Sequence, residues 1–196
     1  MKSVLISIRP KWCEKIASGE KTIEVRKTRP KLQTPFRVYI YRTKGTVPHI
    51  INGKWVQMEV SGTVIGEFTC DRIYGLAPLN HAPDDVEQQA CLTREEIVRY
   101  LKGVGYGWHI SDLKIYDKPK ELGDFWSYNE ALHKRYDAET DFCCYDAANE
   151  YGEALTDCGD AYLDIRNCYR CWNEWSGWCH RIKRPPQSWC YVEELK

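Results

Sequence analysis

The pattern that most restricts the fold lies in residues 3–26, where a short strand, one short helix and a second strand follow in that order. SVLISIR is apolar enough for a buried strand, and PKWCEKIASG carries the punctuation of a short helix. Pro10 suits the first helical turn, and Gly19 suits the residue just past the last turn. KTIEVRK then alternates polar and apolar residues, which is the period of a half-buried strand. This order favours a β-rich fold with few helices.

Further strand signals follow in the first half of the chain. FRVYIYRT (36–43) and TVIGEFTCDRIYGL (63–76) both predict strands. Asn52 and Gly53 lie between them and predict a tight hairpin turn.

Two later segments predict the remaining strands. YGWHISDLKIYD (106–117) is again extended, and Pro119 is expected to end it. The last residues, PPQSWCYVEELK, predict a closing strand after a Pro-Pro break. We therefore expect a small, partly closed β-barrel with helices covering its ends.

The second predicted helix, in LTREEIVRYLKG, begins with a capping box formed by Thr93 and Glu96. We assign this helix a purely structural role. In the first helix, Trp12 and Ile16 lie four residues apart, so one face can pack inward. The apolar face of the second helix is formed by three residues: Ile97, Tyr100 and Leu101.

Length and composition limit the class of protein. The chain has 196 residues, enough for one domain with a core and an insertion. It contains no run of eighteen apolar residues and no small-residue cleavage site after its first strand, so we expect no membrane contact and a cytoplasmic location. In that compartment its ten cysteines would be reduced thiols or metal ligands rather than disulfides.

The net charge of zero conceals two segments of opposite charge. Residues 1–45 carry twelve Lys or Arg against three Asp or Glu, whereas residues 124–164 carry two against eleven. The basic segment favours a polyanionic partner, and the acidic one favours a separate surface.

The strand TIEVR brings charges of both signs together. Glu24 and Arg26 project from one face because strand side chains alternate, and Ile23 and Val25 take the opposite face, toward the core. Lys21, at the helix-to-strand junction, can reach the site that Glu24 and Arg26 border. The surplus positive charge suits a phosphate. The alternative is that these charges only solvate an edge strand.

GEKTIEVR also matches the Gly-x-Lys-x-x-Glu-x-Arg signature of the ASCH domain, a branch of the PUA-like superfamily. The order of VLISIRPKWCEKIASG, VIGEFTCDRIY, YGWHISDLKIYD and RPPQSWCYVEEL resembles ASCH proteins of phages and prophages. The resemblance implies an α+β fold, a PUA-like small β-barrel with flanking helices. It divides the chain into a barrel (1–122), a helical, acidic, Cys-rich insertion (123–184) and a closing strand (185–196).

The resemblance implies that the cleft beside this strand binds RNA or a modified nucleotide, with no cofactor required. Some relatives are hydrolases, either ribonucleases or amidohydrolases of acylated nucleosides. In the amidohydrolase-like relatives a lysine at the position of Lys21 is catalytic, a threonine stands where this chain has Glu24, and a further carboxylate falls near Gln88. Glu24 beside Lys21 favours a charged lysine that binds phosphate over a catalytic one. A third alternative is a protein-interaction adaptor that binds a partner through the insertion.

Aromatic and basic residues outside the signature are further candidates for the ligand site. Tyr41, Trp108 and Trp189 either stack on bases or pack in the core. Lys44 follows Tyr41 closely, and such interleaving of cations and rings is typical of nucleic-acid grooves. His109 is interpreted first as hydrogen-bonded structure and second as an acid or base.

The insertion carries the metal candidates. Cys168 and Cys171 have the spacing that brings two thiolates to one zinc ion. The remaining ligands would come from Cys158, Cys179 or His180, with Cys143 and Cys144 as further options. A structural zinc site, buried free thiols and a redox pair are the three interpretations.

Overall fold

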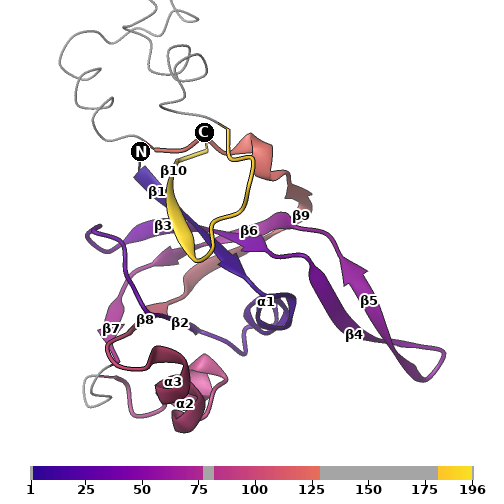
Figure 1. Cartoon of the computed structure of the whole chain (residues 1–196), viewed down its shortest axis with the longest axis horizontal. Coiled ribbons are helices and arrows are strands. Elements are labelled where there is room, and N and C mark those ends of the chain that lie inside the picture. The colour runs from indigo at the N-terminus through magenta and orange to yellow at the C-terminus, as the bar shows by residue number, and fades with distance from the viewer. Residues whose placement is uncertain (1, 77–81, 129–180, 196) are drawn as a thin grey trace, which may run out of the picture.

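A computed structural model describes residues 2–76, 82–128 and 181–195, and it confirms a mostly β fold with a few helices (Figure 1). The insertion cysteines Cys158, Cys168, Cys171 and Cys179 lie outside the described residues. The described helices are α1 (Pro10–Ala17), α2 (Val86–Ala90), α3 (Arg94–Leu101) and the short 3-10 helix η2 (Leu122–Asp124). The described strands are β1 (Lys2–Ile8), β2 (Ile23–Arg26), β3 (Phe36–Arg42), β4 (Gly45–Ile51), β5 (Lys54–Val60), β6 (Thr63–Cys70), β7 (Ile73–Gly75), β8 (Tyr106–His109), β9 (Ser111–Lys120) and β10 (Trp189–Glu193).

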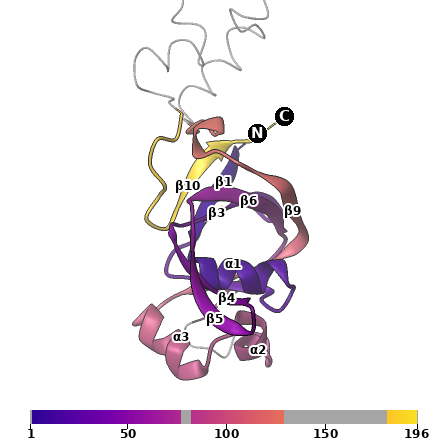
Figure 2. The ribbon, with the colours of Figure 1, turned by 90° about the vertical axis from the view of Figure 1, so that its right-hand side faces the viewer.

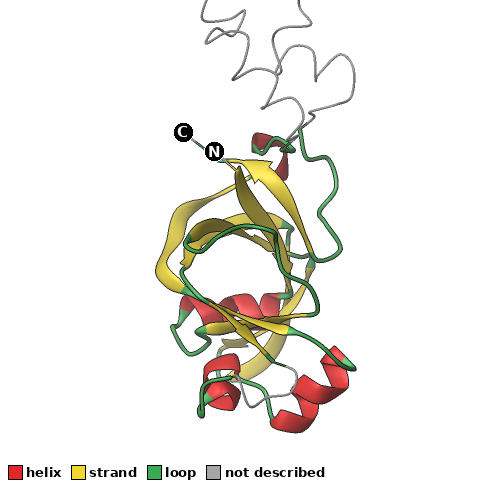
Figure 3. Cartoon of the chain, turned by 90° about the vertical axis from the view of Figure 1, so that its left-hand side faces the viewer, coloured by secondary structure: helices red, strands yellow, loops and turns green. Residues whose placement is uncertain are grey.

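The described strands form three sheets rather than one closed hydrogen-bonded ladder. A five-stranded sheet has the order β10-β1-β3-β6-β9, a three-stranded sheet has the order β2-β8-β7, and β4 pairs only with β5. β1 and β3 are parallel, and α1 lies between β1 and β2 in the chain. The sheets curve around a common interior, with α1 across one end and α2 and α3 beyond it (Figures 2 and 3). The two ends of the chain lie side by side, since β10 pairs with β1.

The first three elements confirm the pattern of the N-terminal segment. Pro10 is the first residue of α1, and Gly19 takes a φ of +79° just past the helix, which a residue without Cβ adopts without strain. The prediction of a half-buried β2 was wrong, because all four of its residues are buried. Ile23 and Val25 pack against α2 and α3, while Glu24 and Arg26 are covered by neighbouring elements on the other face.

The hairpin and the capping box are confirmed. Asn52 and Gly53 both have positive φ, which is the backbone of a type I′ turn between β4 and β5. At the start of α3 the Thr93 hydroxyl accepts a 3.2 Å hydrogen bond from the Glu96 backbone, and the Glu96 carboxylate accepts one of 2.8 Å from Thr93 N. The turn and the capping box each depend on a few neighbouring residues, so both can be predicted from the sequence alone.

Two predicted continuous strands are each divided between sheets. Segment 63–76 breaks after Cys70, so β6 joins the large sheet and β7 the small one. Segment 106–117 breaks at Ile110 in the same way, between β8 and β9. Pro119 does not end its strand, which continues to Lys120. β9 is an edge strand of its sheet, and an edge position tolerates a residue that lacks an N–H group.

The core is divided into three clusters. The largest lies between the two main sheets and α1, and includes Ile6, Val38 and Trp108. A second contains Phe125 and Ile182, which flank the segment between residues 128 and 181. The backbone N–H of Ile182 donates to the carbonyl of Phe125 at 2.8 Å, so the chain leaves and re-enters the described fold at adjacent points. The predicted domain boundaries at 122 and 184 stay a prediction.

Within the described ranges, no helix is both long and apolar enough to cross a lipid bilayer.

Candidate functional site

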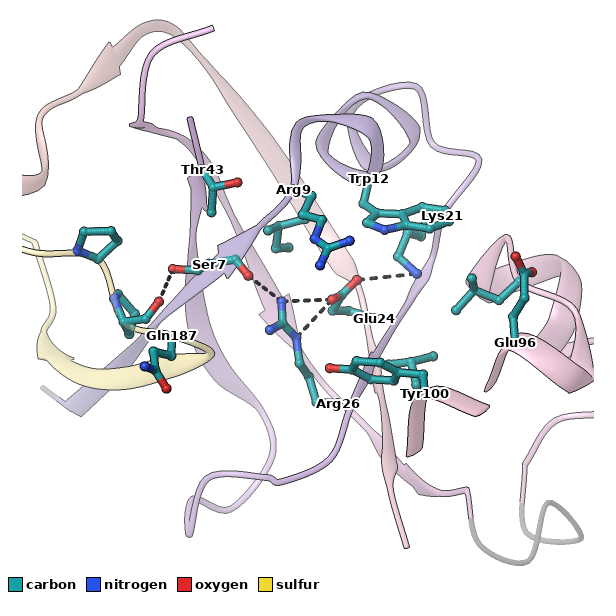
Figure 4. A pocket seen from close by; sticks show the side chains of 15 residues that line it. Ser7, Arg9, Trp12, Lys21, Glu24, Arg26, Thr43, Glu96, Tyr100 and Gln187 are labelled. Atoms are coloured by element: carbon teal, nitrogen blue, oxygen red, sulfur yellow. Dashed lines mark hydrogen bonds and ion pairs between the residues drawn. The ribbon is translucent and has the colours of Figure 1, made fainter. Parts of the chain in front are cut away.

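A pocket of about 690 Å³ lies beside β2, over the face that carries Glu24 and Arg26. Its walls come from the end of β1, the start of α1, β2, the α2–α3 region and the loop before β10 (Figure 4). The pocket is within the size range of small-molecule sites in proteins. Five polar groups from these separate elements converge on it: Ser7, Arg9, Lys21, Glu24 and Arg26. We call it the signature pocket.

Glu24 and Arg26 form the buried floor of this pocket. Arg26 Nε donates a 3.0 Å hydrogen bond to Glu24 Oε1, and Arg26 Nη2 lies 3.0 Å from the same oxygen. Arg26 Nη2 also donates to the Ser7 carbonyl at 2.6 Å, and Nη1 to Ser188 Oγ at 3.3 Å. A guanidinium group has five N–H donors, so one Nη1 donor is left without a partner among the described residues. The side chain thus ties β2 to β1 and to the loop just before β10.

Lys21 is held by three oxygen atoms. Its Nζ donates to the carbonyls of Ala90 at 2.7 Å and Ile23 at 2.8 Å, and lies 3.4 Å from Glu24 Oε2. An ammonium group has three donors, so this set accounts for all of them. Lys21 is only 2% exposed. It therefore fastens the end of α2 to β2, and its charge lies in the wall of the pocket with all of its donors engaged.

The cation best placed to receive a ligand anion is Arg9. It is exposed at the N-cap position of α1, lines the pocket, and forms no ion pair with any described residue. In Figure 4 its guanidinium group lies above the Glu24 carboxylate. Sequence reasoning did not select Arg9. The signal was available, because Arg9, Lys11 and Trp12 interleave cations with a ring.

Two further ionisable residues, Glu96 and Cys13, lie near the network. The pKa of Glu96 is lowered, mainly by the hydrogen bond from the Thr93 backbone, so this rim carboxylate stays negative at neutral pH. Burial, with the Glu24 charge second, raises the pKa of the Cys13 thiol to about 12. Cys13 is therefore a neutral core residue on α1 and not a nucleophile. The lining holds three cations and two carboxylates, which leaves one net positive charge.

The aromatic walls are Trp12 and Tyr100, and neither was predicted as a ligand residue. Trp12 is half-buried on α1, with Lys21 Nζ 5.3 Å from its ring centroid. Tyr100 on α3 is 44% exposed, so its predicted place on the packed face of the helix was wrong. Ile97 and Leu101 form that face, and the Tyr100 ring lies on the opposite side of the Glu24–Arg26 pair from Trp12 (Figure 4). Tyr100 could be identified as a pocket residue only from the position of α3 beside β2.

The aromatic residues selected from the sequence do not line this pocket. Tyr41 is 4% exposed and packs in the second core cluster. Trp108 is fully buried in the first cluster, with its ring centroid 6.0 Å from that of Trp189. The Trp189 Nε1 donates to Thr28 Oγ1 at 3.0 Å. Lys44 is exposed next to the β4–β5 hairpin.

The remaining candidates lie apart from the pocket. His109 Nδ1 is 2.6 Å from Asp71 Oδ1, which joins the end of β8 to the link between β6 and β7. Gln88 is on α2 beside Glu87, whose carboxylate pairs with Arg94 at 2.9 Å. Cys70, with a pKa raised by burial to about 12, is a core thiol like Cys13. Among the described residues, no group of three or more His, Cys, Asp or Glu side chains could hold a metal ion.

Comparison with known proteins identifies the family. The ASCH domain family model matches residues 6–192. A serine-to-alanine variant of ZmASCH from Zymomonas mobilis is similar in fold, with a TM-score of 0.51 and 16% identity over 98% of this chain and 89% of that one. A tyrosine-to-phenylalanine variant of the same protein gives a TM-score of 0.46 and 20% identity over 71% and 84%. No curated protein matches the chain. Since the family match spans nearly all of its residues, the chain belongs to the ASCH domain family.

Proposed function

We propose that this protein binds RNA or a modified nucleotide in the signature pocket. ASCH domains are PUA-like, a superfamily associated with RNA binding, and the chain belongs to that family. The observation that carries the proposal is the pair of rings, Trp12 and Tyr100, on either side of a floor of buried, hydrogen-bonded charge. Rings that flank a basic site are typical of proteins that bind unpaired bases.

The roles within the pocket follow from which donors are free. Arg9 binds the phosphate, because its guanidinium has no carboxylate partner among the described residues. The spare Nη1 donor of Arg26 is available to a base or sugar oxygen. Trp12 and Tyr100 stack on the base. Lys21 and Glu24 hold the floor in place and contribute charge at short range, so they are positioning residues.

The hydrolase alternative rests on the same pocket. A catalytic lysine acts through a free electron pair on its nitrogen, as nucleophile or base. Lys21 instead directs its donors at two carbonyls and a carboxylate, within 2.7 to 3.4 Å. This geometry supports a binding role over a catalytic one, and it is why we place binding first.

The experiment that tests the proposal compares Arg9→Ala with Lys118→Ala. Both substitutions remove one exposed cation, but Lys118 lies on β9 and does not line the signature pocket. Binding of single-stranded RNA and of a set of modified nucleosides is measured by fluorescence anisotropy and calorimetry, and the same samples are analysed for cleavage or deacylation products. Arg9→Ala should weaken phosphate-containing ligands by roughly ten- to hundredfold, the range for a charged hydrogen bond. Equal affinities for the two variants would contradict the proposal.

Product formation decides between the two candidate functions. Turnover that disappears in Lys21→Met, with the variant still folded by circular dichroism, would support the hydrolase. Binding without products would support the binding module. The adaptor alternative predicts a third result, in which a protein partner is lost on deletion of residues 129–180 while RNA affinity is unchanged.

A further inference from the structure

The loop between β2 and β3 is strongly basic and lines a pocket of its own. This pocket, of about 740 Å³, is lined by residues 27–33 together with Val104 and Tyr106. Lys27, Arg29 and Lys31 are all exposed, and the loop contains no acidic residue. We call it the loop pocket.

The three loop cations have no carboxylate partners among the described residues. This differs from Arg26, the residue before the loop, which is paired with Glu24. Three unpaired like charges within five residues repel one another, and binding a polyanion relieves that repulsion. The charge pattern therefore suits several phosphates in a row rather than a single acidic side chain.

The loop is also held in position before any ligand arrives. The Lys31 backbone N–H donates to the Tyr191 hydroxyl at 2.7 Å, and Thr28 Oγ1 accepts from Trp189 Nε1 at 3.0 Å. Both partners belong to β10. The Arg29 guanidinium lies 5.5 Å from the centroid of the Tyr106 ring. Because these contacts fix the loop in advance, less conformational entropy is lost when a ligand binds.

Lys27 and Tyr100 link the residues that line the two pockets. Arg26 lines the signature pocket and Lys27 lines the loop pocket, and consecutive Cα atoms are only about 3.8 Å apart. Tyr100 lines the signature pocket, and its ring centroid is 5.4 Å from Lys27 Nζ. A chain that leaves the signature pocket past Tyr100 therefore meets the first loop cation directly.

We propose that the loop pocket binds the phosphodiester backbone of a single-stranded RNA whose neighbouring nucleotide occupies the signature pocket. This inference rests on the proposed function and narrows its ligand from a free nucleotide to an RNA chain. Tyr106 and the exposed Val104 offer surfaces on which a second base rests.

The test compares a single-stranded RNA hexanucleotide of random sequence with a mixture of the four ribonucleoside monophosphates. Full-length protein is used in four forms: wild type, a loop variant with Lys27→Ala, Arg29→Ala and Lys31→Ala, a control variant with Lys54→Ala, Lys114→Ala and Lys118→Ala, and the single variant Trp12→Ala. The control removes three exposed cations from β5 and β9, outside both pockets. Affinities are measured over a range of salt concentrations.

The loop variant should bind the hexanucleotide more weakly than the control variant, with a log-log salt dependence smaller by about 0.7 for each phosphate contact removed. Its affinity for the monophosphates should stay within twofold of wild type. Equal hexanucleotide affinity and equal salt dependence in the loop and control variants would overturn the inference and leave the signature pocket intact as the proposed site. If Trp12→Ala left hexanucleotide affinity unchanged while the loop variant weakened it, the signature pocket would be contradicted instead.

Discussion

Arg26 Nε donates a 3.0 Å hydrogen bond to Glu24 Oε1, and both residues are less than 10% exposed. Charges buried this deeply are stable only when they are paired and hydrogen-bonded. Here one carboxylate serves two cations, since Lys21 Nζ approaches the other oxygen at 3.4 Å. The signature of the family therefore describes a network that stabilises the fold and, at the same time, forms the floor of a pocket.

Glu24→Ala should lower the free energy of unfolding by about 3–5 kcal/mol, because it leaves two buried cations without their counter-charge. Denaturant unfolding followed by tryptophan fluorescence measures the change. Glu95→Ala, an exposed carboxylate on α3, is the matched control and should change stability by less than about 0.5 kcal/mol. Similar values for both variants would show that the network does not stabilise the fold.

Trp12→Ala should weaken single-stranded RNA binding by roughly five- to 150-fold, the range for loss of one stacked base. Trp55→Ala is the control, because Trp55 is 73% exposed on the β4–β5 hairpin and lines neither pocket. Anisotropy titrations with labelled RNA make the comparison. A larger loss of RNA affinity in Trp55→Ala than in Trp12→Ala would indicate that RNA binds at the hairpin instead.

The Asp71–His109 pair predicts a pH dependence of stability. Burial raises the pKa of Asp71, but the hydrogen bond and charge of His109 outweigh it, so the folded-state pKa lies below the ordinary 3.8. A lowered carboxylate pKa stabilises the fold at pH values above the unfolded pKa, and that stability is lost as the pH falls through the folded pKa. Because Asp71 is 41% exposed, the contribution is below about 1 kcal/mol.

The stability difference between wild type and Asp71→Asn should therefore be present at neutral pH and shrink below pH 3.8. Thermal unfolding over this range measures it. Asp117→Asn, which removes an exposed carboxylate on β9, is the matched control. A difference that grew on acidification would contradict the assigned sign.

Gly66→Ala should destabilise the large sheet. A Cβ at Gly66 would meet the backbone carbonyl of Lys114 on β9, which cannot move without disturbing the ladder. Overpacking of this kind costs about 1–3 kcal/mol. Gly75→Ala is the control, because an added Cβ there has nothing within 4 Å. Denaturant unfolding of both variants compares them, and equal stabilities would mean that β6 and β9 are farther apart than described.

Local signals in the sequence were sufficient for many of the secondary elements. The Asn52–Gly53 turn, the Thr93–Glu96 capping box and Pro10 at the start of α1 each depend on neighbouring residues, and all three are present. The breaks after Cys70 and at Ile110 were missed. They depend on where one sheet ends and the next begins, which hydrophobic periodicity does not record.

The site was predicted in part for the same reason. Period two placed Glu24 and Arg26 on one face, and the structure brings Lys21 to them. The period-two pattern could not show that Tyr100 on α3 lines the pocket beside β2, or that Tyr41 faces the core. An aromatic residue in a β-rich fold looks the same in the sequence whether it packs in the core or binds a ligand. Only tertiary contacts distinguish the two roles.

The most direct test of RNA binding in the signature pocket is photo-crosslinking of thiouridine-containing single-stranded RNA to the full-length protein, followed by mass spectrometry of the linked peptides. If RNA binds there, crosslinks form within the peptides that carry Trp12 and Tyr100, unlabelled RNA competes with them, and Arg9→Ala reduces them. Links confined to the β4–β5 hairpin or to residues 129–180, with none at Trp12 or Tyr100, would contradict it.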